Sequence, residues 1–165
     1  MSFSKYEPQR PNRGFTIIEV MIVLAIAALI LLIVLLAVPA LQRNSRNTAI
    51  KNDASAIVAA ISTYESNNNG AALTTFWDIR QSGATVTVGR SGTKQAEAKV
   101  QAGDKVVRAY TLPPSGPLTP GTIRTVIKKD CDGNTSTRSV AVWYSIETSK
   151  GVPSSSPWNN KCINA

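Results

Sequence analysis

Residues 11–42 decide the fold: PNRGFTIIEVMIVLAIAALILLIVLLAVPALQ. From Val20 to Gln42 this stretch carries no charged side chain, and nearly every residue is apolar. The predominantly apolar run Phe15–Leu41 is long enough, at about 1.5 Å per helical residue, to cross a ~30 Å hydrocarbon core. It also exceeds the apolar region of a secretory signal peptide, which has about 7 to 15 residues. We therefore expect a membrane-spanning helix that begins, unusually, with a carboxylate, Glu19.

A rival interpretation is a long signal peptide. Val38-Pro39-Ala40 has small residues at the spacing that a signal peptidase accepts, and cleavage after Ala40 would release a secreted binding protein. The length of the run and the presence of Glu19 favour a retained helix. Arg10 and Arg13 precede the run, so the N-terminus should stay in the cytoplasm and the rest should lie outside.

The helical pattern continues beyond the apolar run. A stripe of apolar residues recurs at spacings of four and three, which is typical of an amphipathic helix: Ile50, Ala54, Ile57, Ile61 and Tyr64. The sequence Asn67-Asn-Asn-Gly70 predicts the helix end, with Gly70 as the C′ residue. We therefore expect one helix from residue 15 to about 68, apolar all round in its first half and amphipathic in its second, with Pro39 loosening or kinking one turn.

From residue 71 onward the composition shifts to Thr, Val, Gly and Ser. Four β-type runs are expected: Ala84–Val88, Lys105–Leu112, Thr122–Lys128 and Arg138–Glu147. Asp132-Gly133-Asn134 predicts a hairpin turn between the last two, and the short connections favour an antiparallel sheet. A loop tail at 151–157, pinned by Trp158, should follow. The predicted class is α+β, with a long N-terminal helix packed on a small antiparallel sheet.

The opening stretch resembles a known family. Gly14-Phe-Thr-Ile-Ile-Glu19, after a basic leader and before some twenty apolar residues, resembles the processing signature of type IV pilins and of the pseudopilins of type II secretion and competence systems. The resemblance implies a pilin-like fold with four parts: a leader at 1–14, a transmembrane and assembly helix at 15–41, its amphipathic continuation at 42–70, and a β-rich head at 71–165. This chain has no glycine in the apolar run, and Pro39 lies about three residues beyond the usual proline position.

The resemblance also implies a function. A prepilin peptidase would cut between Gly14 and Phe15 and N-methylate Phe15, and Glu19 would pair with the Phe15 amine of a neighbouring subunit. The partners implied are further copies of the chain, membrane lipid before assembly, an assembly ATPase and an inner-membrane platform protein. The subunit would move from the cytoplasmic membrane to a cell-surface filament. A pseudopilin remains the nearest alternative, and a helix-end Glu19 that merely reaches the membrane surface is the structural alternative.

Composition limits the chemistry. The chain has 165 residues, two cysteines, no histidine and a formal net charge of +8. Without histidine the commonest general base and metal ligand is missing, and no nucleophile–base pair is recognisable, so we expect neither an enzyme nor a cofactor. Cys131 and Cys162 can pair if the head is exported, as family members often do near the C-terminus, and two free thiols are the alternative.

Two weaker signals remain. Asp130-Cys-Asp-Gly-Asn134 hints at a calcium loop, but its glycine is fourth rather than sixth, so a polar hairpin turn is the better interpretation. A basic filament could also hold DNA through its phosphates. The candidate residues lie on two runs expected to be neighbours: Arg124, Lys128, Lys129 and Arg138. A solvated basic face is the simpler interpretation, because aromatic side chains for base stacking are sparse nearby.

Overall fold

The computed structural model describes residues 14–75, 78–90, 93, 95–101, 105–110, 112–116, 118–147 and 160–165, with the backbone alone for 105–109. The leader up to residue 13 and the tail with Trp158 lie outside the described residues. The chain divides into two compact units, Met1–Pro39 and Ala40–Ala165.

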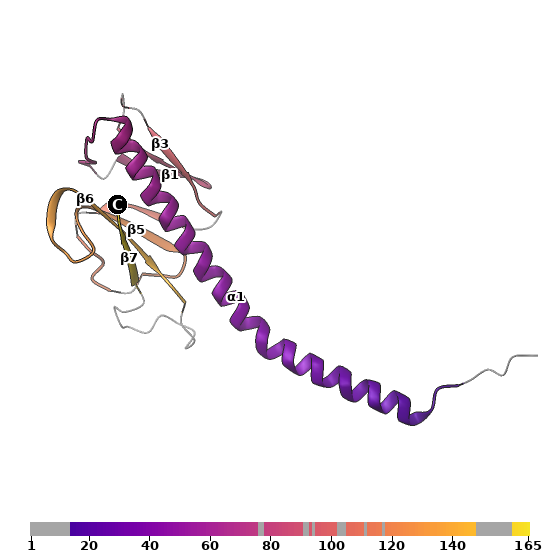
Figure 1. The fold of residues 1–165 in the computed structure, drawn as a ribbon. Helices are drawn as coiled ribbons and strands as arrows, with labels where there is room; N and C mark the ends of the chain where they lie inside the picture. Colours follow the sequence, from indigo (N-terminus) through magenta and orange to yellow (C-terminus); the bar gives the residue numbers. More distant parts are fainter. Residues whose placement is uncertain are drawn as a thin grey trace, which may run out of the picture. The chain divides into compact units, whose positions relative to one another are not determined.

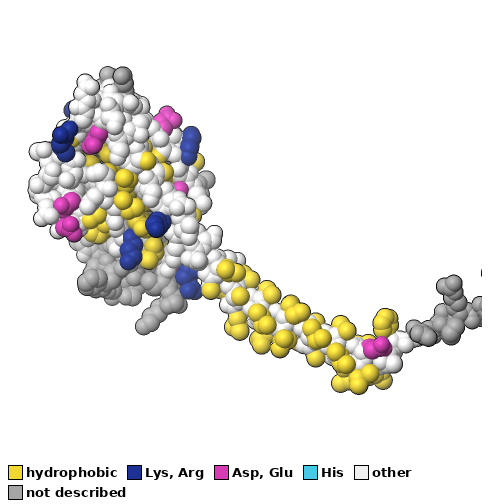
Figure 2. Space-filling model, in the orientation of Figure 1, with side chains coloured by type: hydrophobic (Ala, Val, Ile, Leu, Met, Phe, Trp, Pro, Cys, Tyr) yellow, Lys and Arg dark blue, Asp and Glu magenta, His cyan; other side chains and the backbone are white. Residues whose placement is uncertain are grey.

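One long helix, α1 (Ile17–Asn67), belongs to both units, and it is continuous through Pro39 (Figure 1). The predicted long helix is therefore confirmed. Its first half has no buried residue, and large apolar side chains there are 39% to 89% exposed over Phe15–Leu41. Figure 2 shows this half as an apolar surface with one acidic side chain near its start.

The second half of α1 carries the predicted apolar stripe. Ile50, Ala54, Ile57, Ile61 and Tyr64 are each at most 4% exposed, because strands cover that side of the helix. The helix ends one residue earlier than predicted. Asn69, not Gly70, is the first residue in the left-handed region (φ 55°), and the N–H of Gly70 donates to the Glu65 carbonyl at 2.7 Å. This is the long bond of a Schellman cap, which satisfies a carbonyl at the helix end.

The first sheet has three antiparallel strands in the order β1-β2-β3. They are β1 (Ile79–Ser82), β2 (Thr85–Val88) and β3 (Ala96–Lys99). Only β2 was predicted. The β1–β2 hairpin places Ser82 opposite Thr85, and Gly83 between them takes the positive φ (58°) that the tight turn needs.

The second sheet has four strands in the order β4-β5-β6-β7. They are β4 (Lys105–Tyr110), β5 (Thr122–Lys129), β6 (Thr135–Ser145) and β7 (Asn160–Asn164). β5 and β6 form the predicted antiparallel hairpin, and β7 pairs antiparallel with β6. β4 pairs parallel with β5, which differs from the single antiparallel sheet expected from the sequence. The predicted class, α+β with a long N-terminal helix on small sheets, is confirmed.

A single core joins α1 to both sheets. Alternate residues of the strands enter it, including Val86 and Val88 from β2, Ile123 and Ile127 from β5, and Val140 and Val142 from β6. This core belongs to the second unit and buries one side of the second half of the helix, whereas the large apolar side chains of the first half are exposed among the described residues.

Candidate functional site

The start of α1 places the residues of the expected processing site outside the helix. Gly14, Phe15 and Thr16 precede Ile17, and all three are exposed. No heavy atom lies within 4 Å of the position that a Cβ on Gly14 would occupy. Phe15 is 89% exposed and shares an open hollow with Glu19, Val20 and Val23. The peptide bond between Gly14 and Phe15 is therefore unobstructed by the described residues.

Glu19 lies in the first turn of α1 and closes a capping box with Thr16. Glu19 Oε2 accepts hydrogen bonds from the Thr16 backbone N–H at 2.9 Å and from its hydroxyl at 2.8 Å. In return, the Glu19 N–H donates to Thr16 Oγ1 at 3.3 Å. Two backbone donors that the helix leaves free are thus satisfied, and the negative charge sits at the positive end of the helix dipole.

Thr16 is the residue that sequence reasoning missed. The signal was present, because Thr16-Ile-Ile-Glu19 has the spacing of a capping box, threonine followed three residues later by glutamate.

The geometry of the capping box leaves one oxygen of the Glu19 carboxylate available. Both bonds from Thr16 end on Oε2, and no hydrogen bond among the described residues uses Oε1. Glu19 can therefore cap its own helix and still accept a bond from elsewhere.

The apolar helix that follows is long and apolar enough to cross a membrane. Its most apolar 18-residue window has a mean hydropathy of 3.5, and none of that window is buried within the chain. A helix that is apolar all round and uncovered by its own protein is stable only in lipid or against other apolar surfaces. Its length and composition therefore support an anchoring role.

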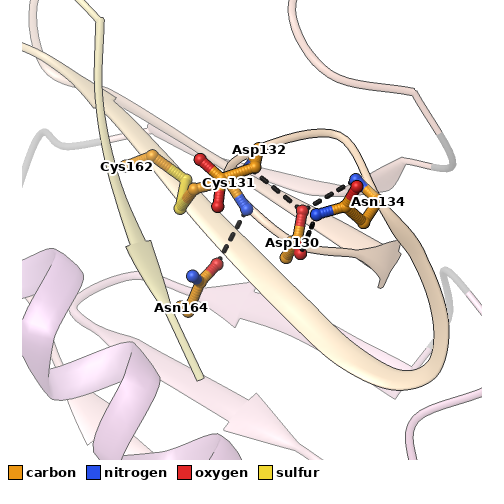
Figure 3. Close-up of a disulfide and its surroundings, with 6 residues drawn as sticks. All are labelled: Asp130, Cys131, Asp132, Asn134, Cys162 and Asn164. Atoms are coloured by element: carbon orange, nitrogen blue, oxygen red, sulfur yellow. Dashed lines mark hydrogen bonds between the residues drawn. A yellow bond between two sulfur atoms is a disulfide. The ribbon is translucent and has the colours of Figure 1, made fainter.

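The two cysteines form a disulfide that joins the turn between β5 and β6 to strand β7 (Figure 3). Cys131 and Cys162 are joined with an S–S distance of 1.93 Å and a Cα–Cα distance of 5.7 Å. The backbone N–H of Cys131 also donates to Asn164 Oδ1 at 2.8 Å. Strand β7, the last of its sheet, is thus attached to the turn before β6 both by the disulfide and by this hydrogen bond.

The turn beside the disulfide uses the Asp130 carboxylate for its own structure. Asp130 Oδ1 accepts from the N–H groups of Asp132 and Asn134 at 3.0 and 2.8 Å, and Oδ2 accepts from the Asn134 side-chain amide at 2.9 Å. The bond from the Asn134 side chain is the main cause that lowers the pKa of Asp130 below its ordinary value. This geometry is that of the predicted polar hairpin turn.

The four candidate DNA-contacting residues lie on neighbouring strands, as expected, but two of them are engaged within the chain. The Arg124 guanidinium stacks on the Tyr110 ring at 3.9 Å, and Arg138 donates to the Gly70 carbonyl at 2.6 Å. Lys128 is exposed and Lys129 half-buried. DNA contact by these residues stays a prediction.

The fold and the helix start together define a class: an α+β protein with a pilin-like long N-terminal helix. Residues 9–35 match the sequence model of the family described as the prokaryotic N-terminal methylation motif, which is the type IV pilin and pseudopilin signature. The match supports a pilin-like or pseudopilin-like precursor, and it indicates a structural protein. Comparisons with curated proteins and with solved structures found no significant match.

Proposed function

We propose that this chain is the precursor of a subunit that polymerises into a type IV pilus-like surface filament. A prepilin peptidase removes the leader, residues 1–14, and N-methylates Phe15. Residues 15–41 hold the subunit in the cytoplasmic membrane with its N-terminus inside, residues 42–70 continue the helix, and residues 71–165 form the head. An assembly ATPase and a platform protein of the inner membrane then drive the subunit into the filament.

The observation that carries this proposal is the contrast within α1. Its second half is covered by the head, but its first half is uncovered over its whole circumference and begins with a carboxylate. Moving that much apolar surface from lipid into water would cost about 25 cal/mol for each Å². A subunit leaves the bilayer only when a core of other apolar helices replaces the lipid, and this requirement favours a polymer over a free protein.

Glu19 supplies what an apolar helix lacks, which is a defined axial position against its neighbours. Packing of leucine, isoleucine and valine changes little when one helix slides along another, whereas a buried charge without a partner costs several kcal/mol. The amine that cleavage creates on Phe15 of a neighbouring subunit is a suitable partner for Glu19. The capping box supports this role, because Glu19 Oε1 makes no hydrogen bond among the described residues.

The mass of the mature protein tests the processing step. Intact-mass measurement and peptide sequencing should find a chain that begins with N-methylated Phe15. A chain that begins at Ser2 would contradict cleavage, and one that begins at Leu41 would favour a secreted protein. Long fibres sheared from the cell surface that contain this chain would support a pilus subunit, whereas confinement to a short structure within the envelope would identify a pseudopilin.

A further inference from the structure

An open cleft lies between the second half of α1 and the paired strands β6 and β7. It has a volume of about 380 Å³, and its lining includes Asn44 and Lys51 from the helix and Lys161 from β7. Both lysines are exposed, and neither ammonium group makes an ion pair or hydrogen bond among the described residues. The side-chain amide of Asn44 has no described partner either, so the cleft presents three groups that can donate to an oxygen-rich anion.

The surroundings of the cleft keep it positive. Arg43 and Arg46 lie on the same helix, eight and five residues before Lys51. The nearby carboxylate of Glu147 is already held, because it accepts from Arg46 Nε and Nη2, both at 2.8 Å. Arg43 acts on the same Glu147 carboxylate, so Lys51 and Lys161 are the two cations at the cleft that have no ion-pair partner among the described residues. Two ammonium groups and an amide around one cleft match the chemistry of a phosphate group.

The position of the cleft along α1 indicates where that phosphate comes from. In an upright helix Val20–Leu41 spans roughly 33 Å, close to the ~30 Å hydrocarbon core, so Leu41 marks its outer boundary. Headgroups extend the bilayer by about 5 to 7 Å on each side. Asn44 lies ~4.5 Å beyond Leu41 and Lys51 lies ~15 Å beyond it. Because side chains of a helix point toward its N-terminus, the long Lys51 side chain points back toward the headgroups.

We propose that this cleft binds the phosphate of an anionic phospholipid in the outer leaflet of the cytoplasmic membrane. The bound headgroup holds the head of the unassembled subunit against the membrane surface. The inference rests on the proposed function, since it requires a subunit that is anchored through residues 20–41 with its head outside. It adds a lipid class and a site to that function, and it means that extraction into a filament must break this contact as well as remove the helix from lipid.

The experiment compares two lysines in the same full-length chain. The protein is reconstituted in phosphatidylcholine vesicles with or without phosphatidylglycerol, and a neutral amine-acylating reagent is added. Peptide mass spectrometry gives the initial acylation rates of Lys51 and Lys128. Lys128 is the matched control because it is exposed on β5, two residues before Asp130 and at the opposite end of that strand from Thr122. The ratio cancels differences in vesicle orientation and in reagent concentration.

We expect phosphatidylglycerol to lower the Lys51-to-Lys128 acylation ratio about fivefold, the effect of one basic residue near an anionic surface. The decrease should largely disappear in 1 M salt, where charges are screened beyond about 3 Å. In a second arm, K51Q/K161Q should retain less phosphatidylglycerol on extraction from mixed vesicles than K128Q/K129Q, which has the same net charge. Equal ratios in both vesicle types, or equal lipid retention by the two variants, would overturn the proposal.

Two further measurements distinguish lipid from free phosphate as the ligand, and failure of the lipid site from failure of the anchoring function. Inorganic phosphate added to pure phosphatidylcholine vesicles should leave the ratio unchanged, and equal protection by free phosphate would show that the cleft does not select lipid. Protease protection of residues 20–41 reports insertion independently. If the helix is protected and the ratio does not change, the lipid site is wrong and the anchoring function stands. If the helix is not protected, both the lipid site and the anchoring function are wrong.

Discussion

The two halves of α1 are parts of one continuous helix, but their apolar residues have different roles. In the first half, apolar side chains cover the whole circumference, and residues such as Leu35 (72% exposed) remain largely exposed. In the second half, the apolar residues form one stripe, and Ile57 within it is completely buried. The difference shows that hydrophobicity alone does not determine burial within a chain. The pattern determines whether the head or an external partner provides the cover.

The largest effect should come from the one charge in the first half. Glu19→Ala should abolish filament growth, because the neighbour's Phe15 amine would be buried without its partner, while membrane insertion and cleavage after Gly14 continue. The measurement compares sheared surface fibres with the mutant subunit in the membrane fraction, whose N-terminus is sequenced. Normal fibre yield would show that Glu19 is not needed for assembly.

Two variants separate the roles of the carboxylate. Glu19→Gln retains the acceptor for Thr16 and hence the capping box, but it loses the charge. If the charge pair drives assembly, Glu19→Gln should fail as fully as Glu19→Ala. Glu65→Ala is the matched control, because it removes an acidic residue from the second half of the same helix. Fibres of this control should form normally.

The next effect acts on the head alone. Replacing both Cys131 and Cys162 by serine opens a loop with a sequence separation of 31 residues. The loss of stability should be about 3 to 4 kcal/mol in the chain-entropy account. Denaturation of the full chain in detergent micelles should show it, with insertion and cleavage unchanged. Equal stability of the two proteins would mean that the hydrogen bond from Cys131 to Asn164 and the β6–β7 pairing hold the C-terminus by themselves.

A matched pair of isoleucines compares the two halves directly. Ile57→Ala should destabilise the head by about 2 to 5 kcal/mol, because it leaves a cavity in a close-packed core. Ile26→Ala removes the same atoms from a residue that is 54% exposed in the first half, and it should leave unfolding of the head unchanged. Both proteins are measured in the same detergent. A comparable loss in Ile26→Ala would show that the first half also supports the head.

The α1 helix and the β5–β6 hairpin could be predicted from the sequence because their signals are local. The α1 helix follows from an uninterrupted apolar run and a stripe at helical spacing, and the β5–β6 hairpin follows from Asp132-Gly133-Asn134 between two β-type runs. The left-handed residue that follows the helix is Asn69 rather than the predicted Gly70, because asparagine also tolerates this region.

The features that sequence reasoning missed depend on distant parts of the chain. Strand β3 has the sequence Ala-Glu-Ala-Lys, which favours a helix by intrinsic propensity, and it becomes a strand through pairing with β2. The parallel pairing of β4 and β5 requires a connection that returns to the same end of the sheet, and no dipeptide marks it. At the candidate site, the sequence placed Glu19 and Phe15 but gave no indication that Glu19 Oε1 would remain available.

The smallest predicted effect concerns Glu147, which fixes the end of β6 to the second half of α1. Its carboxylate accepts two bonds from Arg46, while its backbone N–H and C=O bond to the side chain of Asn47 at 2.7 and 2.9 Å. The hydrogen bond from Arg46 is the main cause that lowers the pKa of Glu147 below its ordinary 4.5, and the charge of Arg43 adds to it. A lowered pKa in the folded state means that folding favours the ionised carboxylate. The contribution of the ionised Glu147 carboxylate to stability is present above pH 4.5. It is lost as the pH falls through the lower pKa that Glu147 has in the folded protein.

Glu147→Gln should therefore melt slightly below the wild-type protein at pH 7, and the gap should close at a pH low enough to protonate Glu147 in the wild type. The change should be much smaller than the loss caused by Ile57→Ala, because Arg46 is largely exposed to solvent. Glu65→Gln is the control, since the Glu65 carboxylate makes no hydrogen bond or ion pair among the described residues. Its melting difference from wild type should not follow the same pH dependence. A gap for Glu147→Gln that stays constant from pH 7 to acid would show that the backbone bonds to Asn47, rather than the charge pair, attach β6 to the helix.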